Sequence, residues 1–313
     1  MLLLFAMSLE DHKLKVFCTV AETKSFSKTS EIVHLTQPAV SLQIQALEEY
    51  YETKLFDRTS NSIALSPSGE VLYKYAKYIL ALYAAAEKEI GKMTGHTKGS
   101  VTIGASTTIG NHILPNVIFN FKKTYPKVKM NVYIENTKKI MDLLNTGTIE
   151  MGLVEGEMSK YKVTIEPVIQ DELFIIVPPN HMWAKKKTIS IAELSKEPFI
   201  FREEGSGTRQ VTEKYFSSHG IKIRDVSLTI TLGSTEAIKE AVESGIGVSI
   251  VSKWVVKKEV KYGSLVTVNI KEGRMLRSFH LVMNKNAILS HAVNEFLSFL
   301  KSYPYDNLLK EEF

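Results

Sequence analysis

Residues 67–93 form one long stretch of helix-forming residues, with no glycine or proline between Gly69 and Gly91. Apolar side chains recur in it at alternating spacings of four and three residues, at Leu72, Ala76, Ile79, Tyr83, Ala86 and Ile90. This heptad pattern predicts a rod of about 40 Å with a narrow apolar seam. Such a seam needs a partner, and we expect the same helix of a second subunit, giving a dimer. The alternative is a helix packed along its own C-terminal domain.

The chain has 313 residues and one cysteine, Cys18, so it can hold two or three domains but neither an internal disulfide nor a cysteine metal cage. We therefore expect a reducing, cytoplasmic location. No segment approaches the roughly 18 unbroken apolar residues of a membrane helix, so no membrane partner is expected. The apolar segment 1–6 lacks the basic flank and cleavage site of a signal peptide, and we expect Met7 to be the native start.

The charge is distributed unevenly along the chain. Residues 1–95 contain 10 lysines and arginines against 11 acidic residues, although the whole chain carries a net charge of +5. A nucleic-acid partner usually leaves a basic footprint, because phosphate contacts dominate affinity. Composition alone therefore does not indicate DNA binding.

The pattern of the first 50 residues does indicate it. An apolar face at Leu14, Phe17, Cys18 and Ala21 predicts a first helix, and Ser25 can cap a second one over residues 26–34. Thr36 precedes Gln37 and Pro38, which are typical of a helix start, and the third helix then buries Val40, Ile44 and Leu47. Two short helices joined by about three residues predict a helix-turn-helix.

The outer face of the third helix is polar and uncharged, with Gln37, Ser41, Gln43 and Gln45. Amide and hydroxyl side chains can bind base edges in the major groove, although such a face is more often simply solvated. Residues 55–65 then predict a short hairpin, or wing, with Arg58 suited to phosphate oxygens, and Ser66 with Pro67 begins the long helix.

From residue 14 to residue 69 the chain resembles the LysR-type transcriptional regulators. The resemblance is carried by Phe17–Glu22, Ser25–Lys28, Leu35–Ile44, Leu47–Glu48, Leu55–Arg58 and Leu65–Gly69. It implies an α/β chain with an all-α N-terminal part: a winged helix-turn-helix domain at 7–65, a dimerising linker helix at 66–93, and a periplasmic-binding-protein-like (type 2) effector domain at 99–302. The two lobes of that domain would span about 99–168 plus 271–302, and about 169–270.

The same resemblance implies a tetramer on an interrupted inverted repeat of promoter DNA, with RNA polymerase as a further partner. The residues expected at the DNA are Ser27, Thr36, Gln37, Pro38, Ser41, Gln43, Arg58, Ser60 and Asn61. Many relatives carry an arginine where this chain has Leu42, so which bases are bound stays open.

The C-terminal part alternates strands with amphipathic helices, as βαβ units do. Strands are predicted at 101–105, 128–134, 151–154, 173–177, 199–201, 227–232, 247–251, 265–270 and 278–283, and helices at 111–124, 138–145, 207–219, 235–244 and 289–302. Ligands bind such folds at the carboxyl ends of strands, where helix N-termini begin.

Three strand ends share hydroxyl groups, glycines or arginines, which together favour a small anion. The residues expected to bind it are Ser106, Thr107, Thr108, Arg202, Ser206, Thr208, Arg209, Ser234 and Thr235. Each hydroxyl can instead be an ordinary helix N-cap. Residues 202–209 resemble LysR-type members that control carbon fixation and sulfur assimilation, which suggests a phosphorylated metabolite or a sulfur oxyanion. No cofactor is expected beside this co-inducer.

Two other classes of protein compete with this hypothesis. An enzyme is disfavoured, because the eight histidines form no metal-binding motif and no nucleophile elbow or Walker motif occurs. A transport solute-binding protein would share the C-terminal part, but it would need export and would not need the helix-turn-helix.

Overall fold

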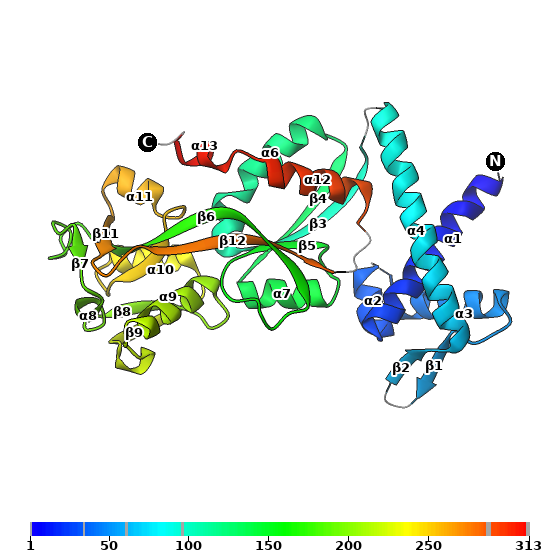
Figure 1. The fold of residues 1–313 in the computed structure, drawn as a ribbon, viewed down its shortest axis with the longest axis horizontal. Coiled ribbons are helices and arrows are strands. Elements are labelled where there is room, and N and C mark those ends of the chain that lie inside the picture. Colours follow the sequence, from blue (N-terminus) through cyan, green and yellow to red (C-terminus); the bar gives the residue numbers. More distant parts are fainter. Residues whose placement is uncertain (1, 34, 60–61, 95–96, 286–288, 311–313) are drawn as a thin grey trace.

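The computed structural model describes residues 2–33, 35–59, 62–94, 97–285 and 289–310. Figure 1 shows a helical N-terminal part, a long helix beside it, and a two-lobed α/β part. The expected combination of a winged helix-turn-helix with a two-lobed α/β domain is confirmed.

The N-terminal domain forms as its periodicity predicts. Ser25 caps the second helix by accepting a hydrogen bond from the Lys28 amide at 3.2 Å, and Thr36 caps the third by accepting one from Ala39 at 3.4 Å. Phe17, Val40 and Ile44 are buried in one core with the wing. The elements are α1 (Leu2–Thr23), α2 (Phe26–Ile32), α3 (Gln37–Tyr50), β1 (Phe56–Thr59) and β2 (Ser62–Leu65).

The long helix α4 (Pro67–Thr94) begins at Ser66, whose hydroxyl accepts the Gly69 amide at 3.0 Å. The seam predicted on this helix is wrong in its first two members. Leu72 and Ala76 pack into the core of the N-terminal domain, because this small domain needs a face of α4 to close its core. The later seam members Ile79, Tyr83 and Ile90 are exposed, and a neighbouring face exposes a further apolar stripe.

Most strands of the α/β part form one main sheet, in the order β4-β3-β5-β12-β6-β11-β7, with β10 also paired to β6. Strands β8 and β9 form a separate parallel pair. Lobe I contains β3, β4 and β5, and lobe II contains β7 to β11. Strands β6 and β12 pair antiparallel and run through both lobes (Figure 1). The bounds are β3 (Gly99–Ser106), β4 (Val128–Glu135), β5 (Met151–Val154), β6 (Val163–Val177), β7 (Thr188–Ile189), β8 (Phe199–Arg202), β9 (Leu228–Leu232), β10 (Ser249–Ser252), β11 (Val266–Ile270) and β12 (Met275–Asn284).

Helices cover these strands, and each lobe has its own core. Phe121, Phe279 and Phe296 belong to the core of lobe I, whereas Phe199, Phe216 and Leu173 belong to that of lobe II. The helices are α5 (Thr107–His112), α6 (Leu114–Thr124), α7 (Thr137–Asn145), α8 (Ile191–Leu194), α9 (Gly207–Ser218), the 3-10 turn η1 (Ile223–Asp225), α10 (Thr235–Glu243), α11 (Lys257–Tyr262), α12 (His291–Ser302) and α13 (Tyr305–Lys310). The domain limits given above stay a prediction.

Two predicted elements differ from the structure. The helix expected over 111–124 is two helices that break at Ile113, because Pro115 has no N–H with which to continue the hydrogen-bond ladder. The strand expected over 173–177 is only the end of the 15-residue β6, whose first half contains Pro167 and several polar residues that hide the strand pattern. The short elements β7, α8, α11 and α13 were not predicted.

Candidate functional site

Helix α3 presents one free face. Pro38, Leu42, Gln45 and Glu49 are exposed at helical spacings of four, three and four, and Gln37 and Ser41 border them. Gln45 donates to the Glu49 carboxylate at 2.8 Å, so its amide is held along the helix. This face begins at the N-terminus of the second helix of a helix-turn-helix, where such motifs contact base edges.

Gln43 does not share this face. It is two residues, or about 200°, around the helix from Ser41. Its Oε1 lies 3.2 Å from Nδ1 of His12 on α1. The structure therefore brings Gln37, Pro38 and Ser41 together and separates Gln43 from them.

The remaining predicted DNA residues flank α3. Ser27 is exposed on α2, and Thr36 is exposed while it caps α3. Arg58 lies on β1 opposite Ile63. Ser60 and Asn61 lie outside the described residues.

Glu48 is a positioning residue that the sequence analysis missed. It is buried on α3, and its carboxylate accepts hydrogen bonds from the amides of Leu55 (3.0 Å) and Phe56 (3.4 Å) and from Lys54 Nζ (2.9 Å). Burial alone would raise the pKa of Glu48, but these hydrogen bonds outweigh it and lower the pKa. The charge thereby fixes the wing relative to α3.

The second candidate site lies at the seam between the lobes, where the predicted hydroxyl groups have two different roles. Ser206 caps α9 and Ser234 caps α10, so for these two residues the N-cap alternative holds. Ser106 occupies the N-cap position of α5 without capping it, and its hydroxyl donates instead to the buried carboxylate of Glu155. Thr107 and Thr108 follow in the first turn of α5.

Arg277 is the centre of this seam. Its side chain, on β12, is only 3% exposed and donates to Asp171 Oδ2 on β6 at 2.6 Å and to Thr208 Oγ1 on α9 at 2.9 Å. Glu155 of lobe I lies 3.5 Å from Arg277 Nη1. The Nη2 nitrogen is buried, and no hydrogen-bond partner for it occurs within the described part of the chain.

Arg202, at the end of β8, is the second buried guanidinium of the seam. Its Nε and Nη2 donate to both carboxylate oxygens of the neighbouring Glu203, at 2.8 and 3.0 Å, and its Nη1 donates to Thr235 at 2.8 Å. Asn136 of lobe I donates to the same carboxylate at 3.1 Å. The Glu203 carboxylate thus lies where an anionic ligand of Arg202 would bind, and it links the lobes.

The lobes approach closely here because α9 begins with a glycine. A β-carbon on Gly207 would come within 2.2 Å of the Glu155 carbonyl oxygen. Nearby, the Lys138 amide of lobe I donates to the Gly205 carbonyl of lobe II at 3.1 Å. Any larger residue at 207 would force the lobes apart.

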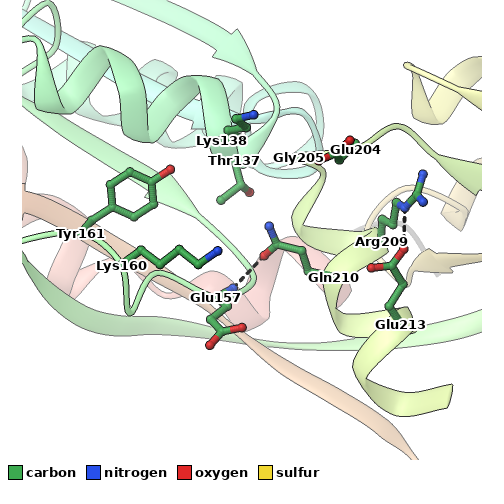
Figure 2. A pocket seen from close by; sticks show the side chains of 10 residues that line it. All are labelled: Thr137, Lys138, Glu157, Lys160, Tyr161, Glu204, Gly205, Arg209, Gln210 and Glu213. Atoms are coloured by element: carbon green, nitrogen blue, oxygen red, sulfur yellow. Dashed lines mark hydrogen bonds and ion pairs between the residues drawn. The ribbon is translucent and has the colours of Figure 1, made fainter. Parts of the chain in front are cut away.

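A pocket of about 540 Å³ flanks this network on the α7–α9 side (Figure 2). Arg209 is the only predicted effector-binding residue that lines it, and its Nε donates to Glu213 at 2.6 Å. Across the pocket, the Glu157 amide of lobe I donates to Gln210 at 2.9 Å. The lining combines three cations with three carboxylates: Lys138, Lys160, Arg209, Glu157, Glu204 and Glu213.

A second pocket of about 490 Å³ lies on the α5–α10 side of the seam. Nε2 of His112, in lobe I, lies 3.4 Å from the Glu236 carboxylate of lobe II. Burial is the main cause that lowers the pKa of His112, and the ammonium groups of Lys239 and Lys258 lower it further. The carboxylates of Glu236 and Glu259 raise the pKa, but they do not outweigh the burial. Within the described residues, no cluster of three or more potential metal ligands occurs, and no helix is long and apolar enough to cross a membrane.

Two family profiles match the chain along most of its length. The LysR substrate binding domain matches residues 94–304, and the bacterial regulatory helix-turn-helix protein of the lysR family matches residues 12–70. The chain belongs to the LysR family of transcriptional regulators. It is therefore a DNA-binding regulator, and the enzyme hypothesis is rejected, as is that of a transport protein.

Comparison with relatives shows which LysR-type regulators this chain is similar to. It is 33% identical over 299 residues to the HTH-type transcriptional regulator CysL of Bacillus subtilis (95% of this chain, 98% of the relative). It is 31% identical over 290 residues to the RuBisCO operon transcriptional regulator of Allochromatium vinosum (93% and 95%). The expected resemblance of the chain to regulators of sulfur assimilation and carbon fixation is confirmed at the level of the whole sequence.

Two solved structures are similar to this LysR-type regulator. The Synechocystis PCC6803 CcmR regulatory domain in complex with 2-PG superposes with a TM-score of 0.61 at 26% identity, covering 66% of this chain and 97% of that one. Full-length OxyR from Pseudomonas aeruginosa superposes with a TM-score of 0.64 at 19% identity, covering 94% and 95%. The latter supports the fold alone.

The Arg277 network generates a prediction about stability. Arg277→Met leaves the buried carboxylates of Asp171 and Glu155 without their guanidinium, which should reduce the free energy of unfolding by about 3–5 kcal/mol. Urea titration measures it through the fluorescence of Trp254, in the core of lobe I, and Trp183, in the core of lobe II. Arg274→Met is the control, since Arg274 pairs with Glu172 but is largely exposed, and we expect a much smaller loss. Equal losses in both variants would contradict the assignment.

His112 generates a prediction about pH. Because its pKa is lowered in the folded chain, the unfolded chain binds a proton more readily. The contribution of neutral His112 to the free energy of unfolding should therefore be fully present above pH 6.5 and decline as the pH falls below that value. We expect the melting temperature to drop less between pH 7.5 and 5.5 in His112→Gln than in the parent. His219→Gln, at an exposed site, should behave as the parent does; identical drops in all three proteins would reject the role of His112.

Proposed function

We propose that this regulator binds an interrupted inverted repeat of promoter DNA as an oligomer and responds to a small anionic metabolite bound between its lobes. One observation carries the effector proposal: the buried Arg202 guanidinium at the seam is neutralised by a carboxylate of the chain itself. Because the regulator would act on transcription, we expect RNA polymerase as a further partner and a cytoplasmic location.

The DNA-binding residues follow from the free face of α3. Gln37, Pro38 and Ser41 would enter the major groove, with Thr36 at the helix start close to the backbone. Ser27, Arg58, Ser60 and Asn61 would contact phosphates on either side. We leave Gln43 out of the base-contacting set, because it faces α1 and His12.

The oligomer is proposed from two unpartnered apolar surfaces. On α4, Val71, Tyr75, Tyr78 and Leu82 are all more than half exposed at spacings of four, three and four, which favours helix pairing into a dimer. The edge strands β4 and β9 expose a second set, Val132, Ile134, Leu228 and Ile230, which favours a second interface and hence a tetramer.

The effector mechanism is an exchange of anions. An anionic ligand would replace the Glu203 carboxylate on Arg202, and the released carboxylate would lose its hydrogen bond to Asn136 of lobe I. Thr235 already accepts a hydrogen bond from Arg202. The other residues expected to supply polar contacts are Ser106, Thr107, Thr108, Ser206, Thr208, Arg209 and Ser234. A ligand that binds one lobe arrangement better than the other shifts the population between them. The 2-PG complex of the CcmR regulatory domain supports a small-molecule effector for this domain.

The exchange can be tested by thermal denaturation of the full chain with inorganic sulfate, inorganic phosphate or 2-PG. A bound ligand raises the melting temperature by mass action. Glu203→Gln removes the competing charge but keeps its shape, so the half-maximal rise should occur at about tenfold lower ligand concentration. Glu204→Gln is the control. Glu204 lines the neighbouring pocket without touching Arg202, so this variant should leave the response unchanged. Equal responses of the two variants would contradict anion binding at Arg202.

The dimer can be tested by sedimentation. Replacing Tyr78 and Leu82 together by lysine places two charges in the exposed stripe of α4, so the species that pairs through this helix should dissociate. Met182→Lys, at an exposed apolar site in lobe II, is the control and should sediment as the parent does. A parent protein that sediments as a single subunit would contradict the proposal.

A further inference from the structure

Leu42 is an apolar side chain without a structural role in the free chain. Its side chain is 65% exposed, whereas Val40, Ile44 and Leu47 of the same helix are buried. Within the described residues it belongs to no apolar cluster of the N-terminal domain. Leu42 therefore adds nothing to the core and is free to contact whatever α3 binds.

Its place on the helix is central to the free face. Pro38 lies one turn before it and is also exposed, so the two form a small apolar patch at a spacing of four residues. Ser41 borders this patch, while the amide of Gln45 one turn later is held by Glu49. The first two turns of α3 carry no acidic side chain that would repel DNA.

The major groove offers only one apolar group on its floor. Purine N7, guanine O6 and thymine O4 accept hydrogen bonds and the exocyclic amines donate them, whereas thymine alone presents a C5 methyl group. A leucine can satisfy none of the polar groups and would remove water from any that it covered. Its favourable partner in the groove is the methyl group.

Resting on the proposed entry of α3 into the major groove, we propose that Leu42, with Pro38 beside it, packs against the C5 methyl group of a thymine in each half-site and so determines an A·T pair at that position. This contact distinguishes T·A from C·G, because the cytosine edge lacks the methyl group. It also orients the pair, since the methyl must lie on the strand that faces Leu42. The proposal assigns a base preference to a residue outside the polar set predicted from the sequence.

The experiment removes one methyl group at a time. A site is first selected from random duplexes with the full-length protein, and each thymine is then replaced singly by uracil, which pairs identically but lacks the C5 methyl. Burial of one methyl-sized group corresponds to about fourfold in affinity, so uracil at one position per half-site should weaken binding by about that factor. Cytosine at this position should bind more weakly than 5-methylcytosine.

The protein variants complete a double-mutant cycle. Leu42→Ala should bind thymine and uracil equally at the sensitive position, whereas Leu42→Met, which keeps an apolar side chain, should retain part of the difference. Gln45→Ala is the matched control on the same face and should keep the full uracil effect. Because Leu42 is exposed, its variants should fold as the parent does, which circular dichroism checks. A thymine–uracil difference that is unchanged in Leu42→Ala, or a selected site without a uracil-sensitive thymine, overturns the proposal.

Discussion

The ion pair between Arg277 and Asp171 is the constraint on which the effector domain depends. The two residues lie opposite each other on β12 and β6, the strands that both lobes share. A buried guanidinium needs a carboxylate partner, and this one also donates to Thr208 of lobe II and lies close to Glu155 of lobe I. Separating this buried ion pair costs much free energy, so we expect the lobes to move about the Arg277–Asp171 contact without breaking it. The seam between the lobes therefore has a fixed centre at Arg277 and contacts on either side of it that can change.

The flanks explain how the same seam can respond to a ligand. On one side the Glu203 carboxylate joins Arg202 to Asn136, and on the other His112 faces Glu236. Each of these contacts between the lobes is made by a charged or titratable group, so a ligand can replace it or a proton can alter it. In the proposed exchange, the Glu203 carboxylate would hold the lobes together without ligand, and the affinity for an anion would be reduced by the free energy of displacing that carboxylate.

Much of the N-terminal domain could be predicted from the sequence, because its signals are local. The caps at Ser25 and Thr36 and the buried stripe of α3 depend on residues within one or two helical turns. The site at the seam between the lobes could be predicted only in part. The strand ends identified Ser106 and Arg202, but Arg277 pairs with a residue 106 positions away, and nothing within its own segment indicates burial. Strand β6 was mostly missed for a related reason: its polar residues are satisfied by distant partners, which hides the apolar pattern.

Helix α4 shows why a heptad pattern does not by itself identify an interface. Its first turns serve two surfaces at once, since Leu72 and Ala76 close the core of the N-terminal domain while Tyr75, Tyr78 and Leu82 remain exposed beside them. A helix between two folded parts is apolar on more than one face, and spacing alone cannot say which face a neighbour in the same chain covers. The division has a consequence for regulation. Because α3 and the wing share the core that α4 completes, a rotation of α4 would move the free face of α3 with it. In the proposed dimer, a change in how two α4 helices pair would therefore reach the DNA through α3.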